Sequence, residues 1–536
     1  MLITTMPLWR VRAQTISKQG FGGINNSPGT MNQTKKIVSR FPSTPAFFLA
    51  GVLLISLVLT PVLSFSQQKD YLFYVKTHCD NLITYGKDVY GTKKSHMLAS
   101  VIDSRDMSVP KSKVPPTEGT RESDRAVGGS NYYHDVETIR ILDDLTQLTG
   151  DPKYKSAGED YTRDFIKYCQ NPYTGLLGWG EHLYYNFFNE TIMEGDLDRP
   201  GTMFTHEFIE NTPPWTYLWN IDSAAVRKAI AGVRGHFRSP VTQSFLFNRH
   251  ARWNKVEKPE YRGLEQYQDG GQAWIKHSGL YAYSFSFLYD KNHNPEWKRW
   301  AEGSGNLYWN YRNPKTNLIV SCIDDPRPTG RYSSLTSTAL LCYYLLKASA
   351  INPAFAGFRE KAGVMFKAAE KFSWDPKQNS YHALVDLDGK PVGTEMIPVI
   401  ATGYGVADML LFGSVAAYFY KVTGDKAYLA MVKRVADIVV DHTWPDKFVV
   451  NSLASNLQFS LDAYEILGDE RMYEKAKKLA EIGVQTLWSG KLFLREPKDP
   501  YYEAKLGTNS LVAGFLRLHY LEKNNKPAAS IGRWSI

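Results

Sequence analysis

A recurring segment limits the folds that this chain can adopt. Four copies begin at Leu145, Leu345, Phe419 and Ala463, and a weaker copy begins at Leu288. Each copy runs from an apolar helix end through Gly or Asn, then Asp or Asn-Pro, into an alanine-rich amphipathic stretch. Because Gly favours a helix stop and Asp or Asn favours a helix N-cap, each copy predicts the tight turn of a helical hairpin.

Longer turns often follow the tight turns, as in "NPYTGLLGWG", "NPKTNLIVS" and "DPKQNSYHALVD". Alternating tight and long turns between helix pairs are typical of α-hairpins arranged in a ring. Long runs with period-two alternation are scarce. We therefore predict an all-α dominated (α/α)6 or (α/α)7 toroid that occupies residues 67–536 as a single domain. The Pro-, Gly- and charge-rich stretch 109–130 is expected to be a long loop within it.

The N-terminal residues 1–66 differ from the rest of the chain. They contain the apolar run "AFFLAGVLLISLVLTPVLSFS", which follows basic residues and ends in a small-x-small triplet. This pattern predicts a secretory signal peptide cleaved after Ser66, and Met31 offers a second candidate start. An uncleaved anchor is the alternative, since about 20 apolar residues can span a bilayer, but Pro61 and the small residues favour removal. We expect an exported protein, periplasmic or secreted, without stable membrane insertion after cleavage.

Charge and motif content exclude several functions. Residues 1–66 hold six Lys or Arg and no acidic residue, which leaves 57 basic and 54 acidic residues, or +3, for the remainder. This balance is not typical of a protein that binds nucleic acid. No convincing GxSxG, P-loop, GxGxxG or Cys-His zinc motif is present, which argues against phosphoryl transfer and dinucleotide chemistry. The four scattered cysteines are expected to be buried thiols.

Polar and aromatic side chains gather in four stretches, which are residues 128–137, 178–186, 204–215 and 247–253. Long loops between hairpins line the funnel of a toroid, so function is expected in such stretches. Together they supply two imidazoles and one carboxylate, from His182, Glu207 and His250. Such a set suits Zn²⁺, Mn²⁺ or a similar divalent ion and leaves positions open for substrate. Spacing this long has little specificity, so ordinary structural roles remain the alternative.

The segment "THEFIEN" can be interpreted as part of a helix. If it is helical, His206 and Glu210 form one i, i+4 pair, while Glu207 and Asn211 form a second pair on a neighbouring face. Only one of these pairs can then face the funnel squarely. The Pro-Pro pair at 213–214 would end such a helix.

Aromatic side chains beside the polar stretches are candidates for contact with a sugar. Trp179 and Trp253 flank these stretches and could stack on a sugar face, although most aromatic residues of an α/α toroid belong to its core. His277 follows a Gly-Gly turn and is compatible with a loop at the funnel. A core histidine bonded to the backbone is the alternative for this residue.

The succession "GLLGWGEH", "THEFIENTPPWTYLWNID" and "FRSPVTQSFLFNRHARW" resembles the α/α-toroid polysaccharide lyases of the pectate lyase family 2 type. The resemblance covers mainly residues 128–254. It implies that a divalent metal ion, with Mn, Zn or Ca as candidates, is held by His182, Glu207 and His250. It also implies that Arg249 abstracts a proton. The match at the first ligand is approximate, and His206 or His134 could take its place.

The resemblance implies β-elimination on a uronate-containing polysaccharide or oligosaccharide. Neutralising the uronate carboxylate makes the C5 hydrogen acidic, a base removes it, and the substituent at C4 leaves. A guanidinium normally stays protonated, so Arg249 could instead bind the carboxylate while Tyr185, Tyr132 or His134 moves the proton. The residues predicted to contact substrate are Tyr132, Trp179, His206, Trp253 and His277.

Three alternatives remain open from the sequence. A dehydratase would eliminate water from a terminal uronate with the same groups. A six-hairpin glycoside hydrolase, such as a glucuronidase or unsaturated glucuronyl hydrolase, would need two opposed carboxyl groups; the candidates are Asp135, Glu181, Glu207 and Asp324. A non-catalytic glycan-binding toroid would need neither a metal nor a base. The sequence makes no prediction of the oligomeric state.

Overall fold

The computed structural model describes residues 70–118, 120–196, 199–238, 245–255, 273–403 and 407–523. The predicted extension 1–66, its signal peptide and the candidate start at Met31 lie outside these ranges. Gln68–Ile536 is one compact unit by its internal contacts, whereas the proposed division after residue 66 stays a prediction. Among the described helices, none combines the length and the apolar character needed to cross a bilayer.

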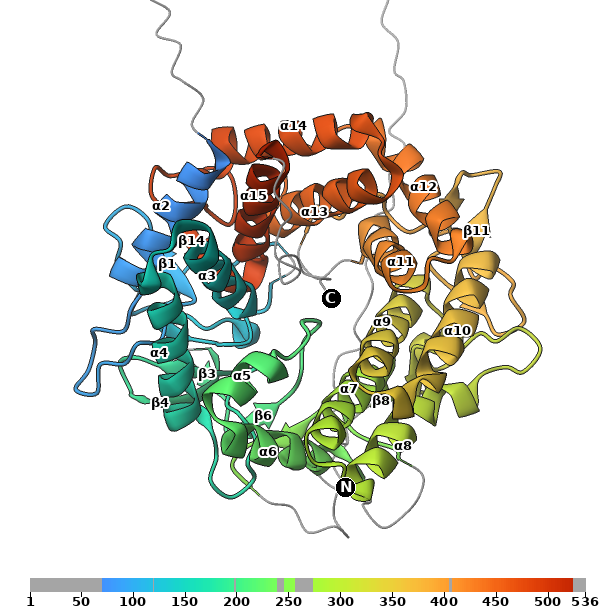
Figure 1. Cartoon of the computed structure of the whole chain (residues 1–536), viewed down its shortest axis with the longest axis horizontal. Coiled ribbons are helices and arrows are strands. Elements are labelled where there is room, and N and C mark those ends of the chain that lie inside the picture. The colour runs from blue at the N-terminus through green and yellow to red at the C-terminus, as the bar shows by residue number, and fades with distance from the viewer. Residues whose placement is uncertain are drawn as a thin grey trace, which may run out of the picture. The chain divides into compact units, whose positions relative to one another are not determined.

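The described helices form a ring of seven packed pairs (Figure 1). The inner helices are α3 (Val136–Thr149), α5 (Trp215–Ile221), α7 (Ile275–Asn292), α9 (Leu335–Ile351), α11 (Met409–Thr423), α13 (Val450–Leu467) and α15 (Thr508–Glu522). Their outer partners are α4 (Pro152–Cys169), α6 (Ser223–Gly232), α8 (Pro295–Tyr311), α10 (Gly357–Ser373), α12 (Lys426–Val440), α14 (Glu470–Leu487) and α2 (Tyr71–Tyr85). Six pairs are consecutive in sequence, and the seventh joins α15 to α2. The predicted toroid is confirmed, and it has the (α/α)7 form.

The tight turns of the hairpins have the predicted chemistry. Gly150 ends α3 with φ 71°, and Asp151 caps α4 by accepting a hydrogen bond from the amide of Lys153. Gly424 and Asp425 repeat this arrangement between α11 and α12. Only glycine adopts this left-handed conformation without strain, and the aspartate satisfies a helix amide that would otherwise lack a partner. These local rules produce the hairpins, and packing of their apolar faces produces the ring.

Burial differs between the two layers of the ring. The inner helices α9 and α13 are buried on almost every face, because they contact outer helices on one side and neighbouring inner helices on the other. The outer helices α12 and α14 bury a single apolar stripe. All four cysteines are buried free thiols, as predicted.

Short antiparallel strands occupy the loops between hairpins. The four-stranded sheet contains β2 (Gly129–Ser130), β3 (Leu183–Asn186), β4 (Thr191–Asp196) and β5 (Arg199–Pro200). The two-stranded pairs are β1 (Val101–Asp103) with β14 (Tyr501–Glu503), β6 (Thr205–His206) with β7 (Ala251–Arg252), β8 (Ala273–Trp274) with β9 (Cys322–Ile323), β10 (Tyr332–Ser333) with β13 (Val385–Asp386), and β11 (Trp374–Asp375) with β12 (Ser380–Tyr381).

The interpretation of "THEFIEN" as helical is wrong. Thr205–His206 forms β6, and the chain stays non-helical until α5 begins at Trp215. Pro214 therefore precedes a helix instead of ending one. Pairing with β7 holds this segment extended, so successive side chains point to opposite faces and no i, i+4 pair forms.

Candidate metal centre and active site

The strand pair β6–β7 brings Glu207 beside Arg249 and His250. Glu207 directly follows β6, and His250 directly precedes β7. The antiparallel register pairs His206 with Ala251, so the residues just beyond the pair lie next to each other. Two positions separated by more than forty residues in sequence therefore meet through a very short piece of sheet.

A close backbone contact brings His182 to the same place. Gly180 forms a parallel bridge with Glu207, and the amide of Glu181 donates to the carbonyl of Glu207 over 3.1 Å. Gly180 has φ 98°, and a Cβ atom there would lie 1.9 Å from the Glu207 carbonyl oxygen. Only glycine fits this approach. The glycine before "EH" therefore allows His182 to reach the centre.

The three predicted metal-ligating side chains converge. His182 Nε2 lies 3.1 Å and His250 Nε2 lies 2.8 Å from the same atom, Glu207 Oε2. One ligand atom from each residue falls within 4.8 Å of the others. Two imidazole nitrogens and one carboxylate oxygen suit a borderline divalent cation and leave coordination positions open. The residues present therefore fit the metal ion that the resemblance implies.

The second oxygen of Glu207 faces two further nitrogen groups. Arg249 Nη1 donates to Oε1 over 3.3 Å, and His277 Nε2 lies 3.5 Å from the same oxygen. Glu207 is fully buried. A buried carboxylate is stable only when it is paired, so this single side chain organises the whole centre.

Asp124 is a candidate functional residue that sequence reasoning missed. Its Oδ1 lies 3.1 Å from His182 Nδ1, on the side of the ring opposite Glu207. An imidazole whose Nδ1 donates to a carboxylate presents Nε2 as a ligand. Asp124 lies in η1 (Glu122–Asp124), a short turn within the loop 109–130, and is held by Arg121 and Lys505. Neither spacing nor periodicity in that charge-rich loop marks this residue.

Electrostatic interactions within the centre oppose the cost of burial. Burial alone would raise the pKa of Glu207, but His250, His182 and Arg249 together hold it well below its ordinary value. Burial would lower the pKa of His182, yet its bonds to Asp124 and Glu207 raise it to about 10. In the metal-free protein, a proton on His182 therefore stands between two carboxylates.

We expect Asp124→Asn to weaken metal binding by about 10- to 100-fold, because the amide no longer fixes the His182 ring and its tautomer. Excess metal should restore most of the activity, since every direct ligand remains. Titration of the chelated protein with Mn²⁺ or Zn²⁺, followed by calorimetry, measures the change. Asp106→Asn, in an exposed loop, serves as the matched control. Equal affinities for the two variants would exclude the positioning role of Asp124.

Two histidines proposed as substitutes for His182 lie elsewhere. His206 is 1% exposed; it accepts a hydrogen bond from the Trp179 indole and lies 2.8 Å from His236 Nε2. Burial holds the pKa of His206 well below its ordinary value. Strand alternation turns it into the core while its neighbour Glu207 faces the centre, so His206 reaches neither metal nor substrate.

His134 lines a separate small cavity. Its Nε2 lies 3.2 Å from Asn131 Nδ2, while its buried Nδ1 has no hydrogen-bond partner among the described residues. The cavity, of about 50 Å³, also contacts Glu210 and Lys505. This volume accommodates only water-sized molecules. A role for His134 in proton transfer stays a prediction, although the structure gives it no contact with the candidate metal ligands.

Three aromatic residues named from the sequence belong to the core. Tyr132 is fully buried, its hydroxyl forms a hydrogen bond with the Thr162 hydroxyl, and its ring stacks on Phe165. Trp179 is fully buried, and Tyr185 is 1% exposed with a buried hydroxyl that has no partner among the described residues. Burial raises the pKa of Tyr132 and of Tyr185. Substrate contact by Tyr132 or Trp179, and proton transfer by Tyr132 or Tyr185, are therefore contradicted by burial.

The other two predicted contact residues have structural partners. Trp253 is half-buried, and its indole donates to the Cys169 carbonyl over 3.1 Å. His277 is fully buried, and its Nε2 lies 3.0 Å from the Phe208 carbonyl oxygen as well as near Glu207. His277 thus supports the centre from behind and does not contact a substrate.

Lys276 is a second group near the centre that the sequence did not single out. It pairs with Glu210 at 2.5 Å, and its side chain is 19% exposed. Burial opposes its charge, but Glu210, Glu181 and Glu207 raise its pKa. Arg121 adds a further cation, paired with Glu181 and Asp124. These side chains add positive charge beside the candidate metal centre.

The described residues thus define an α/α toroid with a candidate His-Glu-His metal centre supported by an arginine. A family model described as periplasmic pectate lyase matches residues 111–336. That range includes the three candidate ligands, Arg249 and Asp124. The resemblance inferred from the sequence is confirmed: the chain is a pectate lyase-like α/α toroid.

Solved structures of other proteins match this chain at low sequence identity and with TM-scores below 0.5. A GH76 α-mannanase from Bacteroides thetaiotaomicron is 10% identical with a TM-score of 0.46, covering 86% of this chain and 98% of that chain. A cellobiose 2-epimerase from Bacillus thermoamylovorans is also 10% identical with a TM-score of 0.46, covering 84% and 98%. At these scores the similarities carry no argument about function.

Proposed function

We propose that this protein is a polysaccharide lyase that cleaves a uronate-containing polysaccharide or oligosaccharide by metal-assisted β-elimination. The convergence of His182, Glu207 and His250 on one point, with Arg249 on the same carboxylate, carries this proposal. The match to the periplasmic pectate lyase model supports an enzyme that acts on carbohydrate. The same match supports an exported location.

His182, Glu207 and His250 would hold the divalent cation, which supplies charge neutralisation to the uronate carboxylate. Glu207 also orients Arg249 through the 3.3 Å hydrogen bond between Nη1 and Oε1. The Nε atom of Arg249 is buried and has no hydrogen-bond partner among the described residues. We therefore expect the remaining N–H groups of the Arg249 guanidinium to donate hydrogen bonds to the substrate.

Arg249 acts in this proposal as the base that removes the C5 proton. Lys276 and Arg121 interact electrostatically with Glu207 and offer cationic hydrogen-bond donors to substrate carboxylates. The C4–O bond breaks as the C4–C5 double bond forms, and the proton taken from C5 balances the charge of the departing oxygen. No water is activated.

The deciding experiment uses the purified protein with a panel of uronate polysaccharides. Ultraviolet absorbance of the new C4–C5 double bond should rise, and a chelator should abolish the rise. New reducing ends without that absorbance would overturn the lyase and favour the hydrolase. Elimination from a terminal uronate, without cleavage of the polymer, would identify the dehydratase variant.

Metal binding is expected to depend on pH through His182. Its pKa of about 10 means that the metal-free imidazole is protonated at neutral pH. A ligand to a metal must be neutral, so binding releases this proton, and affinity rises about tenfold per pH unit below that pKa. Calorimetry in two buffers of different ionisation enthalpy should show about one proton released per cation. An affinity that is flat across neutral pH would contradict the protonated state of His182.

A further inference from the structure

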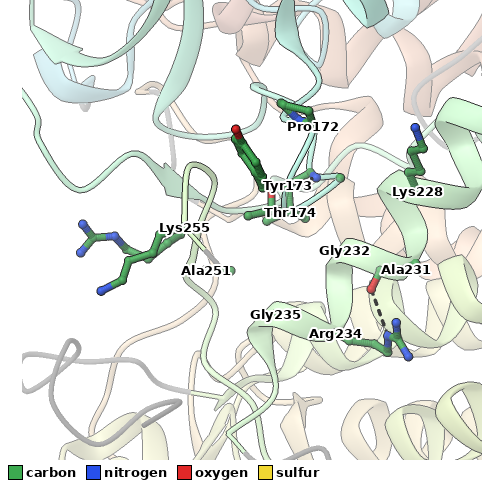
Figure 2. A pocket seen from close by; sticks show the side chains of 13 residues that line it. Pro172, Tyr173, Thr174, Lys228, Ala231, Gly232, Arg234, Gly235, Ala251 and Lys255 are labelled. Carbon is green, nitrogen blue, oxygen red and sulfur yellow. Dashed lines mark hydrogen bonds between the residues drawn. The ribbon is translucent and has the colours of Figure 1, made fainter. Parts of the chain in front are cut away.

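A second pocket lies beside β7, separate from the metal centre (Figure 2). It has a volume of about 540 Å³, within the range of about 300 to 1,000 Å³ typical of small-ligand sites. Figure 2 shows the loop with Pro172, Tyr173 and Thr174 on one side and the α6 residues Lys228 and Gly232 on another. Ala251 of β7 borders the pocket, while the preceding residue of the chain, His250, contacts Glu207.

The lining of this pocket is strongly cationic. Its charged residues are Lys228, Arg234, Arg252 and Lys255, and no acidic side chain is among the lining residues. Arg234 forms an ion pair with Glu296, which is not among the lining residues. Lys228 and Lys255 are exposed. A cleft lined by one sign of charge focuses its field and raises the local concentration of ligands of opposite charge.

Arg252 has unused hydrogen-bonding capacity in this lining. Its Nε atom is buried and has no hydrogen-bond partner among the described residues. Among the described residues, the one hydrogen-bond partner of its Nη1 is a weak acceptor, the Met203 sulfur, at 3.3 Å. Buried guanidinium groups normally have oxygen partners. A carboxylate in the pocket would satisfy this group and the lysines together.

The uncharged part of the lining suits a sugar. The lining includes Gly175, Gly232, Gly235 and Ala251, which contribute backbone and little side chain. Tyr173 stands at the rim and is 81% exposed, so its ring can cover a sugar face. An exposed aromatic ring, small lining residues and several cations together match an oligosaccharide that bears carboxylates.

We propose that this pocket is a second binding site for an anionic, uronate-bearing oligosaccharide, distinct from the reaction centre. The choice of uronate rests on the proposed function, whereas the anionic character rests on the lining alone. A site one strand away from the centre would hold a long polymer near the reacting residues between turnovers. It would raise the affinity for polymers while leaving the turnover of short oligomers unchanged.

The test measures binding directly, so that its outcome does not depend on lyase activity. The full chain carrying His250→Ala, treated with chelator, is titrated with hexagalacturonate and with its methyl ester by calorimetry. The double change Lys228→Glu and Lys255→Glu reverses two charges of the pocket. The matched control is Lys155→Glu with Lys298→Glu. It reverses two solvent-accessible helix lysines outside the pocket, whose pairs to Glu159 and Glu302 span 3.9 and 3.8 Å.

We expect the pocket variant to bind hexagalacturonate at least tenfold more weakly than the control does. We expect the methyl ester to bind to the protein with an unaltered pocket about as weakly as hexagalacturonate binds to the pocket variant. Tyr173→Ala, at an exposed position, should weaken binding without a change in charge. Equal affinity of pocket variant and control, or no binding by the His250→Ala protein, would overturn the second site. Inorganic phosphate could instead weaken binding of the hexamer as much as charge reversal does, while Tyr173→Ala has no effect. That result would show a general anion site and would also overturn the proposed oligosaccharide site.

Discussion

Replacing Glu207 with Gln is expected to abolish metal binding and to lower kcat/KM by about 10³-fold or more, because one carboxylate organises every charged group of the centre. Its oxygens contact His182, His250 and Arg249 within 3.3 Å. The neutral amide removes the charge that compensates the buried cations. Breaking such a buried pair costs about 3 to 5 kcal/mol of stability. Metal content, turnover and thermal melting measure the three effects.

The matched control for this prediction is Glu302→Gln, the same change at a partly exposed position of α8 that pairs with Lys298 over 3.8 Å. It should leave metal binding, turnover and melting temperature unchanged. A Glu207→Gln protein that retains stoichiometric metal would show that the imidazoles suffice. That result would exclude the three-residue centre proposed here.

Arg249→Lys is expected to lower kcat by about 10²- to 10⁴-fold with little change in metal affinity. Lysine keeps the positive charge, but it lacks the planar donors that contact Glu207 and substrate at once. Metal affinity should persist because the direct ligands remain in place. The measurements are steady-state kinetics on a uronate polymer and metal titration of the chelated protein.

Arg163→Lys is the control for Arg249→Lys, since it makes the same change at an exposed position of α4 that lines neither the candidate centre nor the second pocket. It should leave kcat unchanged on the same polymer. If Arg249→Lys kept the full rate, charge alone would be sufficient at this position. Proton abstraction by the guanidinium would then be excluded.

The hairpins of this protein follow directly from local sequence. A glycine that adopts φ 71° at residue 150 and an aspartate that caps the next helix at 151 act within a few residues of chain. Their effect depends on local backbone geometry and on helix amides that need a partner. Both requirements can be recognised from the residue types in the sequence. The predicted toroid was therefore correct, and the structure adds that α15 and α2 close the seventh pair.

The candidate site was predicted in part. The residue types at 182, 207 and 250 suggested a divalent cation, and the resemblance supplied the role of Arg249. The aromatic residues Tyr132 and Trp179 were assigned to substrate in error, since polar neighbours in sequence do not reveal that these rings face the core. Asp124 was missed because its partner, His182, lies 58 positions away.

The sequence by itself determined the helical turns, the hairpins and the kinds of side chain available near the funnel, because each of these depends on neighbours along the chain. Only the tertiary structure decided which of His206 and Glu207 enters the centre. A two-residue strand paired with a distant segment turns one of them toward the core and the other toward the cation site. Such alternation follows from hydrogen bonds between segments far apart in sequence, which no local pattern specifies.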